Sequence, residues 1–116
     1  MFEGFIASEI VKGQVNEGGR RELYHFRDEQ GLEVDFVVPG RVGSLLLVEC
    51  KTTRTVTPAM AGPIQRLAGA LRKKRSKRTA VHMFLVHQAP QSGATTPAIA
   101  PGVRALPWPD FLTKAL

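Results

Sequence analysis

The spacing of apolar residues predicts three helices. Over residues 2–14, apolar side chains recur at steps of three and four, the period of one helical face. These residues are Phe2, Phe5, Ile6 and Ile10. The same spacing returns after Pro63, with an apolar face of Ile64, Leu67, Ala68 and Leu71. We expect a last helix over residues 107–116, with an inner side formed by Trp108, Phe111 and Leu112.

The first two strands are predicted as a hairpin. Residues 22–28 mix apolar and polar positions, and a short turn ending at Gly31 joins them to residues 32–38. Strict alternation in 32–38 predicts two opposite faces. One face would carry Leu32, Val34 and Phe36, and the other Glu33, Asp35 and Val37.

Two later segments are nearly continuous apolar runs, residues 44–50 and 80–86. Such runs are typical of central strands buried on both faces. Residues 88–102 are rich in Pro, Gly, Ala and Thr, so we expect a loop there. A short edge strand is expected over residues 103–106.

The order of these elements predicts the fold. Strands joined by a hairpin are antiparallel, whereas the strand–helix–strand unit over residues 44–86 is expected to be a right-handed crossover with parallel strands. The predicted order is α-β-β-β-α-β-(β-α), an α/β or α+β fold with a mixed sheet flanked by helices. With 116 residues and no internal repeat, residues 1–116 are expected to form a single domain.

The charge is unevenly distributed along the chain. Residues 1–50 contain five basic and nine acidic residues, and residues 51–116 contain eleven basic residues and one acid. Six cations close the second helix: Arg72, Lys73, Lys74, Arg75, Lys77 and Arg78. This basic tract favours a polyanionic partner, bound through sequence-independent contacts to a nucleic-acid backbone. Alternatively, it is a solvated helix end whose cations oppose the helix dipole.

Several classes are excluded by composition. The lone cysteine, Cys50, excludes an internal disulfide framework and a cysteine-rich zinc site. No apolar run approaches the roughly 20 residues that span a bilayer. The N-terminus lacks the basic segment of a signal peptide. We therefore expect a cytoplasmic protein with no membrane partner.

Two acids within apolar strands give the strongest chemical signal. Asp35 lies between Val34 and Phe36, and Glu49 follows four apolar residues. Ionised groups are costly there unless they are paired or bound to a metal. Two carboxylates on adjacent strands predict a Mg²⁺ or Mn²⁺ site. Lys51 shares a face with Glu49 and is suited to hold or deprotonate a water, or to steady a phosphate.

Structural explanations of the same residues remain open. In the first explanation, Asp35 forms an ion pair with Arg27 or Lys51. In the second, Glu49 and Lys51 form an ion pair at the end of a strand. Cys50 is expected to be a small buried hydrophobe. The histidines lack metal-ligand spacing and are expected to be ordinary strand residues; they are His25, His82 and His87.

These residues resemble a known motif. Asp35, thirteen residues and then Glu49-Cys50-Lys51 is similar to the Asp…(Asp/Glu)-x-Lys motif of the PD-(D/E)XK nuclease superfamily. The superfamily core of helix, three strands, helix and strand agrees with the predicted order, and the resemblance implies a restriction-endonuclease-like sheet. More narrowly, FEGFIASE, YHFRDEQGLEVDFVV and LLLVECK resemble the nuclease-like domain at the C-terminus of a group of prokaryotic AAA-type ATPases.

The resemblance implies a role for individual residues. Asp35 and Glu49 would be the metal ligands, and Lys51 would position the attacking water. A glutamate of the first helix often completes such sites; Glu3 fits the usual apolar spacing better, and Glu9 is its competitor. Arg27 would contact a phosphate or pair with an acid. Gln65 is a weaker candidate, at a position of the second helix where related enzymes have a polar residue.

The function expected from the sequence is a Mg²⁺- or Mn²⁺-dependent nuclease that hydrolyses phosphodiester bonds of nucleic acid. DNA is the expected partner, although the sequence leaves the choice between DNA and RNA open. The alternative is a catalytically silent accessory domain that binds DNA or a protein partner. An ATPase module precedes this domain in relatives, so the chain would be either an excised part of a larger ATPase or a stand-alone remnant. It lacks a G-x-x-x-x-G-K-[ST] segment of its own. A small RNA-binding module is a third interpretation, but no aromatic stacking platform accompanies the basic tract.

Overall fold

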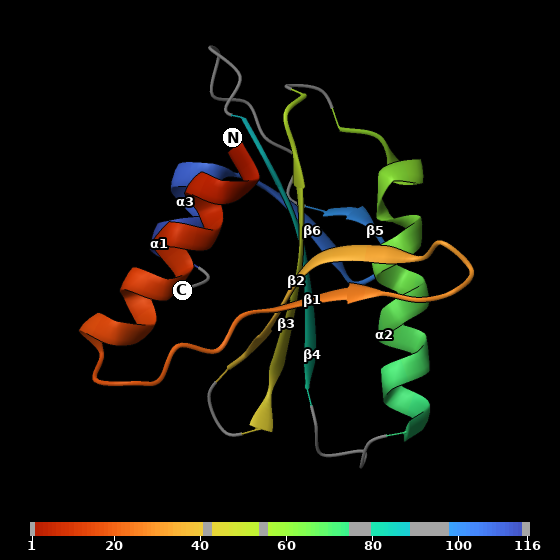
Figure 1. The fold of residues 1–116 in the computed structure, drawn as a ribbon. Coiled ribbons are helices and arrows are strands. Elements are labelled where there is room, and N and C mark those ends of the chain that lie inside the picture. Colours follow the sequence, from red (N-terminus) through yellow and green to blue (C-terminus); the bar gives the residue numbers. More distant parts are fainter. Residues whose placement is uncertain (1, 41–42, 54–55, 75–79, 89–97, 115–116) are drawn as a thin grey trace.

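The computed structural model describes residues 2–40, 43–53, 56–74, 80–88 and 98–114. In chain order the elements are α1 (Phe2–Asn16), β1 (Tyr24–Arg27), β2 (Glu33–Pro39), β3 (Leu45–Lys51), the 3₁₀ helix η2 (Pro58–Ala61), α2 (Gly62–Lys74), β4 (Val81–His87), β5 (Ala98–Ala100), β6 (Val103–Pro107) and α3 (Trp108–Lys114). Figure 1 shows the sheet between two helical layers, with α1 and α3 on one face and α2 on the other. The predicted α+β fold with a mixed sheet flanked by helices is confirmed.

The strands of the described residues form one sheet in the order β1-β2-β3-β4-β6-β5. Pairing is antiparallel from β1 through β3 and parallel from β3 through β4 to β6. The change of direction falls at β3, whose first five residues are buried. β3 and β4 pair in parallel, and α2 lies between them in chain order, which confirms the predicted strand–helix–strand unit.

Each face of the sheet has its own apolar core. Ile6 and Ile10 of α1 pack on the face that carries Val48, together with Phe111 of α3. Ile64 and Leu67 of α2 pack on the opposite face, which carries Leu47. Because side chains alternate along β3, Glu49 and Lys51 lie on the α2 face, and Cys50 packs with the α1-side core.

The predicted alternation along β2 is wrong. Val34 packs in the α2-side core, whereas Phe36 packs in the α1-side core, although two residues that are two positions apart would share a face in a regular strand. The reason is a β-bulge. Tyr24 pairs with Val37 and Phe26 with Val34, so His25 alone stands opposite both Asp35 and Phe36. A bulge adds one residue to one strand and re-aims the side chains around it.

The segment after β4 also differs from the prediction. The expected loop over 88–102 contains strand β5, which pairs antiparallel with β6 through a turn at Gly102, where φ is 75°. β6 is consequently an internal strand between β4 and β5 and does not form the edge. Residues 89–97 of that expected loop lie outside the described residues.

Candidate active site

Asp35 and Glu49 meet where the ladder between β2 and β3 ends. The last regular pair is Phe36 with Val48, so the next residues along the two strands are Asp35 and Glu49. The Asp35 N–H donates to Glu49 Oε1 at 3.3 Å, and the Cys50 N–H donates to Asp35 Oδ2 at 2.8 Å. Side-chain oxygens therefore accept from these two backbone amides. We call Asp35 and Glu49 the carboxyl pair.

The Glu49 carboxyl is held in an unfavourable environment for a charge. Only 6% of the surface of Glu49 is exposed. Burial, the hydrogen bond with the Asp35 side chain and the negative charge of Asp35 raise the pKa of Glu49 from 4.5 to about 8, and the Lys51 ammonium opposes this rise. A carboxyl with this pKa keeps its proton at neutral pH. The carboxyl pair therefore holds a proton on Glu49 at neutral pH.

Lys51 and His87 lie side by side at the carboxyl ends of β3 and β4. The two residues are partners in the parallel register, and the preceding partners on the same face are Glu49 and Leu85. His87 is 4% exposed, and its Nδ1 donates to the Gln88 carbonyl at 2.9 Å. Ligands of sheets with parallel strands bind beyond the carboxyl ends of those strands. The pair and Lys51 occupy such a position.

The structure distinguishes the two glutamates of α1. Burial raises the pKa of Cys50 far above its usual range, and the negative charges of the carboxyl pair and of Glu3 raise it further. Glu3 lies in the first turn of α1, which begins at the carboxyl end of β3 in Figure 1, the same end of the sheet as the pair. Glu9 lies further along α1 and forms an ion pair with Lys12, with Nζ and Oε1 3.5 Å apart.

The donor set of the carboxyl pair fits a hard divalent cation. Mg²⁺ and Mn²⁺ prefer carboxylate oxygens, and Mg²⁺ in particular keeps several water ligands and binds through one or two carboxylates plus a substrate phosphate. Within the described residues, no group of three or more His, Cys, Asp and Glu side chains is arranged to hold a metal ion. A cation held by the carboxyl pair would therefore have two protein carboxylates as ligands, with water and phosphate completing its shell.

Residues 1–101 match the model of a family described as Domain of unknown function (DUF4143). The chain belongs to this family. The matched range includes the carboxyl pair, Lys51 and Glu3, whereas α3 lies beyond it. No curated protein and no solved structure matches the chain. In the part of this DUF4143 chain that the structure describes, no helix is long and apolar enough to span a membrane.

The predicted phosphate contacts of this DUF4143 chain lie away from the carboxyl pair. Arg27 forms an exposed ion pair with Glu33, with Nε and Oε1 2.7 Å apart, so among the described residues it is the partner of Glu33 and not of Asp35. Arg72, Lys73 and Lys74 are exposed in the last turn of α2. Figure 1 shows that this end of α2 lies opposite to the carboxyl end of β3. The remaining cations of the basic tract lie outside the described residues: Arg75, Lys77 and Arg78.

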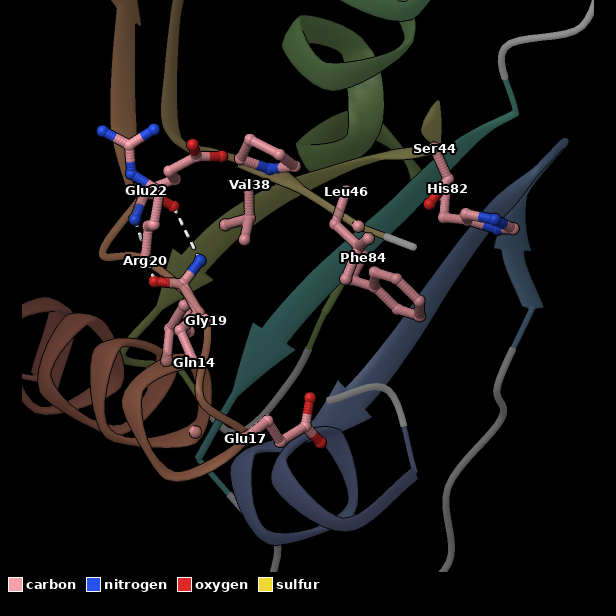
Figure 2. Close-up of a pocket in the computed structure, with 14 residues that line it drawn as sticks. Gln14, Glu17, Gly19, Arg20, Glu22, Val38, Ser44, Leu46, His82 and Phe84 are labelled. Atoms are coloured by element: carbon pink, nitrogen blue, oxygen red, sulfur yellow. Dashed lines mark hydrogen bonds between the residues drawn. The ribbon is translucent and has the colours of Figure 1, made fainter. Parts of the chain in front are cut away.

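A hollow lies at the same distant end of the sheet, on the α1 face. It has a volume of about 760 Å³, and its floor is formed by Ile10, Val38, Leu46 and Phe84. Its rim includes Gln14, Arg20, Glu22 and His82, and Figure 2 shows Gln14 in hydrogen bonds with the backbone of Glu22. We call this hollow the amino-end groove. Shape and chemistry point to different places here. The chemistry is the stronger guide, because the pKa of Glu49 is raised at the carboxyl end of β3 and such groups concentrate at functional sites.

Two features of the site have little or no sequence signal. His87 follows a buried run and shares its register with Lys51, which sequence spacing alone does not reveal. The contact of His25 with Asp35 depends on the bulge, because Nδ1 of His25 lies 2.7 Å from the Asp35 carbonyl across the hairpin. Gln65, the polar residue expected near the site from α2, donates instead to the Pro101 carbonyl at 3.2 Å.

Proposed function

We propose that this chain is a divalent-metal-dependent nuclease domain that hydrolyses phosphodiester bonds of nucleic acid. The observation that carries the proposal is the carboxyl pair, in which Glu49 is buried and Asp35 half-buried, with Lys51 on the same face as Glu49. Two acids this close repel each other when both are ionised. Binding a divalent cation relieves that repulsion, so the pair is suited to exchange its proton for a metal ion. The resemblance to the PD-(D/E)XK superfamily rests on the same residues.

The roles of the residues follow from their positions. The carboxylates of Asp35 and Glu49 would hold the metal, which when bound polarises the phosphate and lowers the pKa of a bound water. Lys51, on the same face as Glu49, would orient the attacking water and offset the charge that develops on the scissile phosphate. Glu3, in the first turn of α1, would add negative charge to the same end of the sheet.

Metal binding is the first test of this proposal. We expect calorimetry to show that the wild type binds Mn²⁺ and that Asp35→Asn loses most of this affinity, because one of the two ligands becomes neutral. Glu33→Gln is the matched control. It removes a carboxylate from the same strand, and this carboxylate pairs with Arg27 on the exposed hairpin. Equal Mn²⁺ affinity in the wild type and Asp35→Asn would reject the metal site.

A second function is favoured by the separation of charges. The described cations of the basic tract and the carboxyl pair lie at opposite ends of the sheet. A catalytically silent accessory domain, which binds DNA or a protein partner for an ATPase module in the same chain, needs no contact between these regions. Incubation with Mn²⁺ and single-stranded DNA, double-stranded DNA or RNA distinguishes the two functions. Cleavage supports the nuclease, whereas Mn²⁺ binding without any cleavage supports the accessory domain.

A further inference from the structure

The β-bulge brings Asp35 into contact with His25 of the neighbouring strand β1. Opposite the single residue His25 of β1 stand two residues of β2, Asp35 and Phe36. His25 contacts both of them. Its Nδ1 lies 2.7 Å from the carbonyl oxygen of Asp35, and its ring centroid lies 5.3 Å from that of Phe36. A carbonyl only accepts, so Nδ1 carries the proton and donates it.

Asp35 is therefore held at three points. Its N–H donates to Glu49 Oε1, its carbonyl accepts from His25, and its carboxylate accepts from the Cys50 N–H. Two of these contacts come from β3, the strand that carries the other half of the carboxyl pair. The third comes from β1, through the side chain of His25, an exposed residue whose ring also contacts Phe36 at the margin of the α1-side core. An exposed residue with this contact set is placed to fix a geometry more than to fill a core.

We propose that His25 is a positioning residue for the carboxyl pair: by holding the Asp35 carbonyl in the bulge, it directs the Asp35 carboxylate toward Cys50 and Glu49. This inference rests on the proposed function for its metal-binding consequence, but its structural consequence is independent of any metal. Groups that orient a metal ligand typically change metal affinity by roughly 10- to 100-fold when they are removed. Loss of the His25 donor is expected to fall in this range.

The chain offers matched variants for the test. His25→Phe removes the donor and keeps a ring against Phe36, whereas His25→Asn keeps an N–H donor close to the position of Nδ1. His82→Phe is the control, because it makes the same change at another exposed strand histidine, at the amino end of β4.

Amide hydrogen exchange gives a readout that needs no metal. The Cys50 N–H donates to the Asp35 carboxylate, so displacement of that carboxylate exposes this amide. In His25→Phe we expect the Cys50 amide to exchange about fivefold faster or more, the factor for one lost hydrogen bond. The Leu47 amide, in the middle of the same strand, is expected to keep its wild-type rate. Mn²⁺ affinity is expected to fall about 10- to 100-fold, and His25→Asn to restore both quantities.

Each outcome decides one of the two proposals. Faster exchange at both Cys50 and Leu47 means that His25 only stabilises the fold, and unchanged exchange at Cys50 means that it does not hold Asp35; either result overturns the inference. If the wild type binds no Mn²⁺ but Cys50 exchange still responds to His25→Phe and recovers in His25→Asn, the positioning role stands and the metal-dependent function fails.

Discussion

The two ends of the sheet differ in what they carry: one holds the carboxyl pair, and the other holds the amino-end groove. At the carboxyl end of β3, two acids are packed together, one of them is buried, and its pKa is raised to about 8. At the other end, the amino-end groove has a volume of about 760 Å³ and is lined by apolar and polar side chains. The carboxyl end of β3 carries an acid with a raised pKa, whereas the amino end carries an open groove.

The difference shows why volume alone is a poor guide to function in this chain. A groove with an apolar floor arises wherever the helices do not cover a sheet completely. α1 and α3 leave the amino ends of β3 and β4 less covered, as Figure 1 shows. A buried acid beside a second acid has no such trivial origin, because apolar residues at positions 35 and 49 would cost less free energy to bury. Perturbed groups of this kind concentrate at functional sites.

The largest expected effect separates a catalytic residue from a structural one. Lys51→Ala is expected to lower the rate of metal-dependent cleavage by ~10²–10³, the usual effect of one electrostatic contact in a transition state. Its free energy of unfolding should change by only about 0.5 kcal/mol, because Lys51 is partly exposed where the chain leaves β3. His82→Ala, at the rim of the amino-end groove, should keep the wild-type rate. Unfolding of the chain by Lys51→Ala would instead identify Lys51 with Glu49 as a structural ion pair.

The second expected effect is a dependence of stability on pH that comes from Glu49. In the unfolded chain this carboxyl releases its proton near pH 4.5, whereas in the folded chain it keeps it to about pH 8. Between these values the folded state binds more protons, so the free energy of unfolding falls as the pH rises, by up to about 1.4 kcal/mol per pH unit. Urea unfolding between pH 4.5 and 8 measures this contribution as the difference in slope between wild type and Glu49→Gln.

The control for this pH dependence lies at the amino-end groove. Glu22→Gln removes a carboxyl from the rim and leaves Glu49 in place, so it should retain the downward contribution of Glu49. The same slope in wild type and Glu49→Gln would mean that the carboxyl pair does not hold its proton. The contrast between the two ends of the sheet would then disappear.

The smallest expected effect concerns the described cations of α2. Replacement of Arg72, Lys73 and Lys74 by Ala should weaken binding to DNA and reduce the slope of log affinity against log salt by about 0.9 for each lost phosphate contact on duplex DNA. Binding measured by fluorescence anisotropy at several salt concentrations gives both quantities. Arg27→Ala is the control, because its guanidinium is paired with Glu33. An unchanged slope in the triple variant would identify these cations as a solvated helix end.

Much of the fold is predictable because it depends on local patterns. The apolar run at residues 44–50 marks β3 as a central strand, and the spacing after Pro63 marks the buried face of α2. The bulge is not predictable in this way, because it is a property of the β1–β2 pairing and leaves the alternation of the sequence intact. β5 is likewise missed, because three residues in a segment rich in Pro and Gly give too short a pattern.

The candidate site likewise has some features that are visible in the sequence and others that depend on how the strands pair. The unusual positions of Asp35 and Glu49 are visible in the sequence, because each stands among apolar neighbours. The proton that the pair holds is not visible, because it depends on how completely the neighbouring strands bury Glu49. The contact between His25 and the Asp35 carbonyl depends on the bulge and is hidden for the same reason.

The topology of the pair also sets an order of events in folding. Asp35 and Glu49 lie on antiparallel neighbours, β2 and β3, that a short connection joins, so their contact closes a small loop at low entropic cost. The desolvation of Glu49 also requires β4, which is joined to β3 by the long crossover through α2. Contacts of greater sequence separation form more slowly. Uptake of a proton by Glu49 during refolding near pH 7 would therefore mark the docking of β4, and a pH-indicator dye in a stopped-flow mixer would time that step directly.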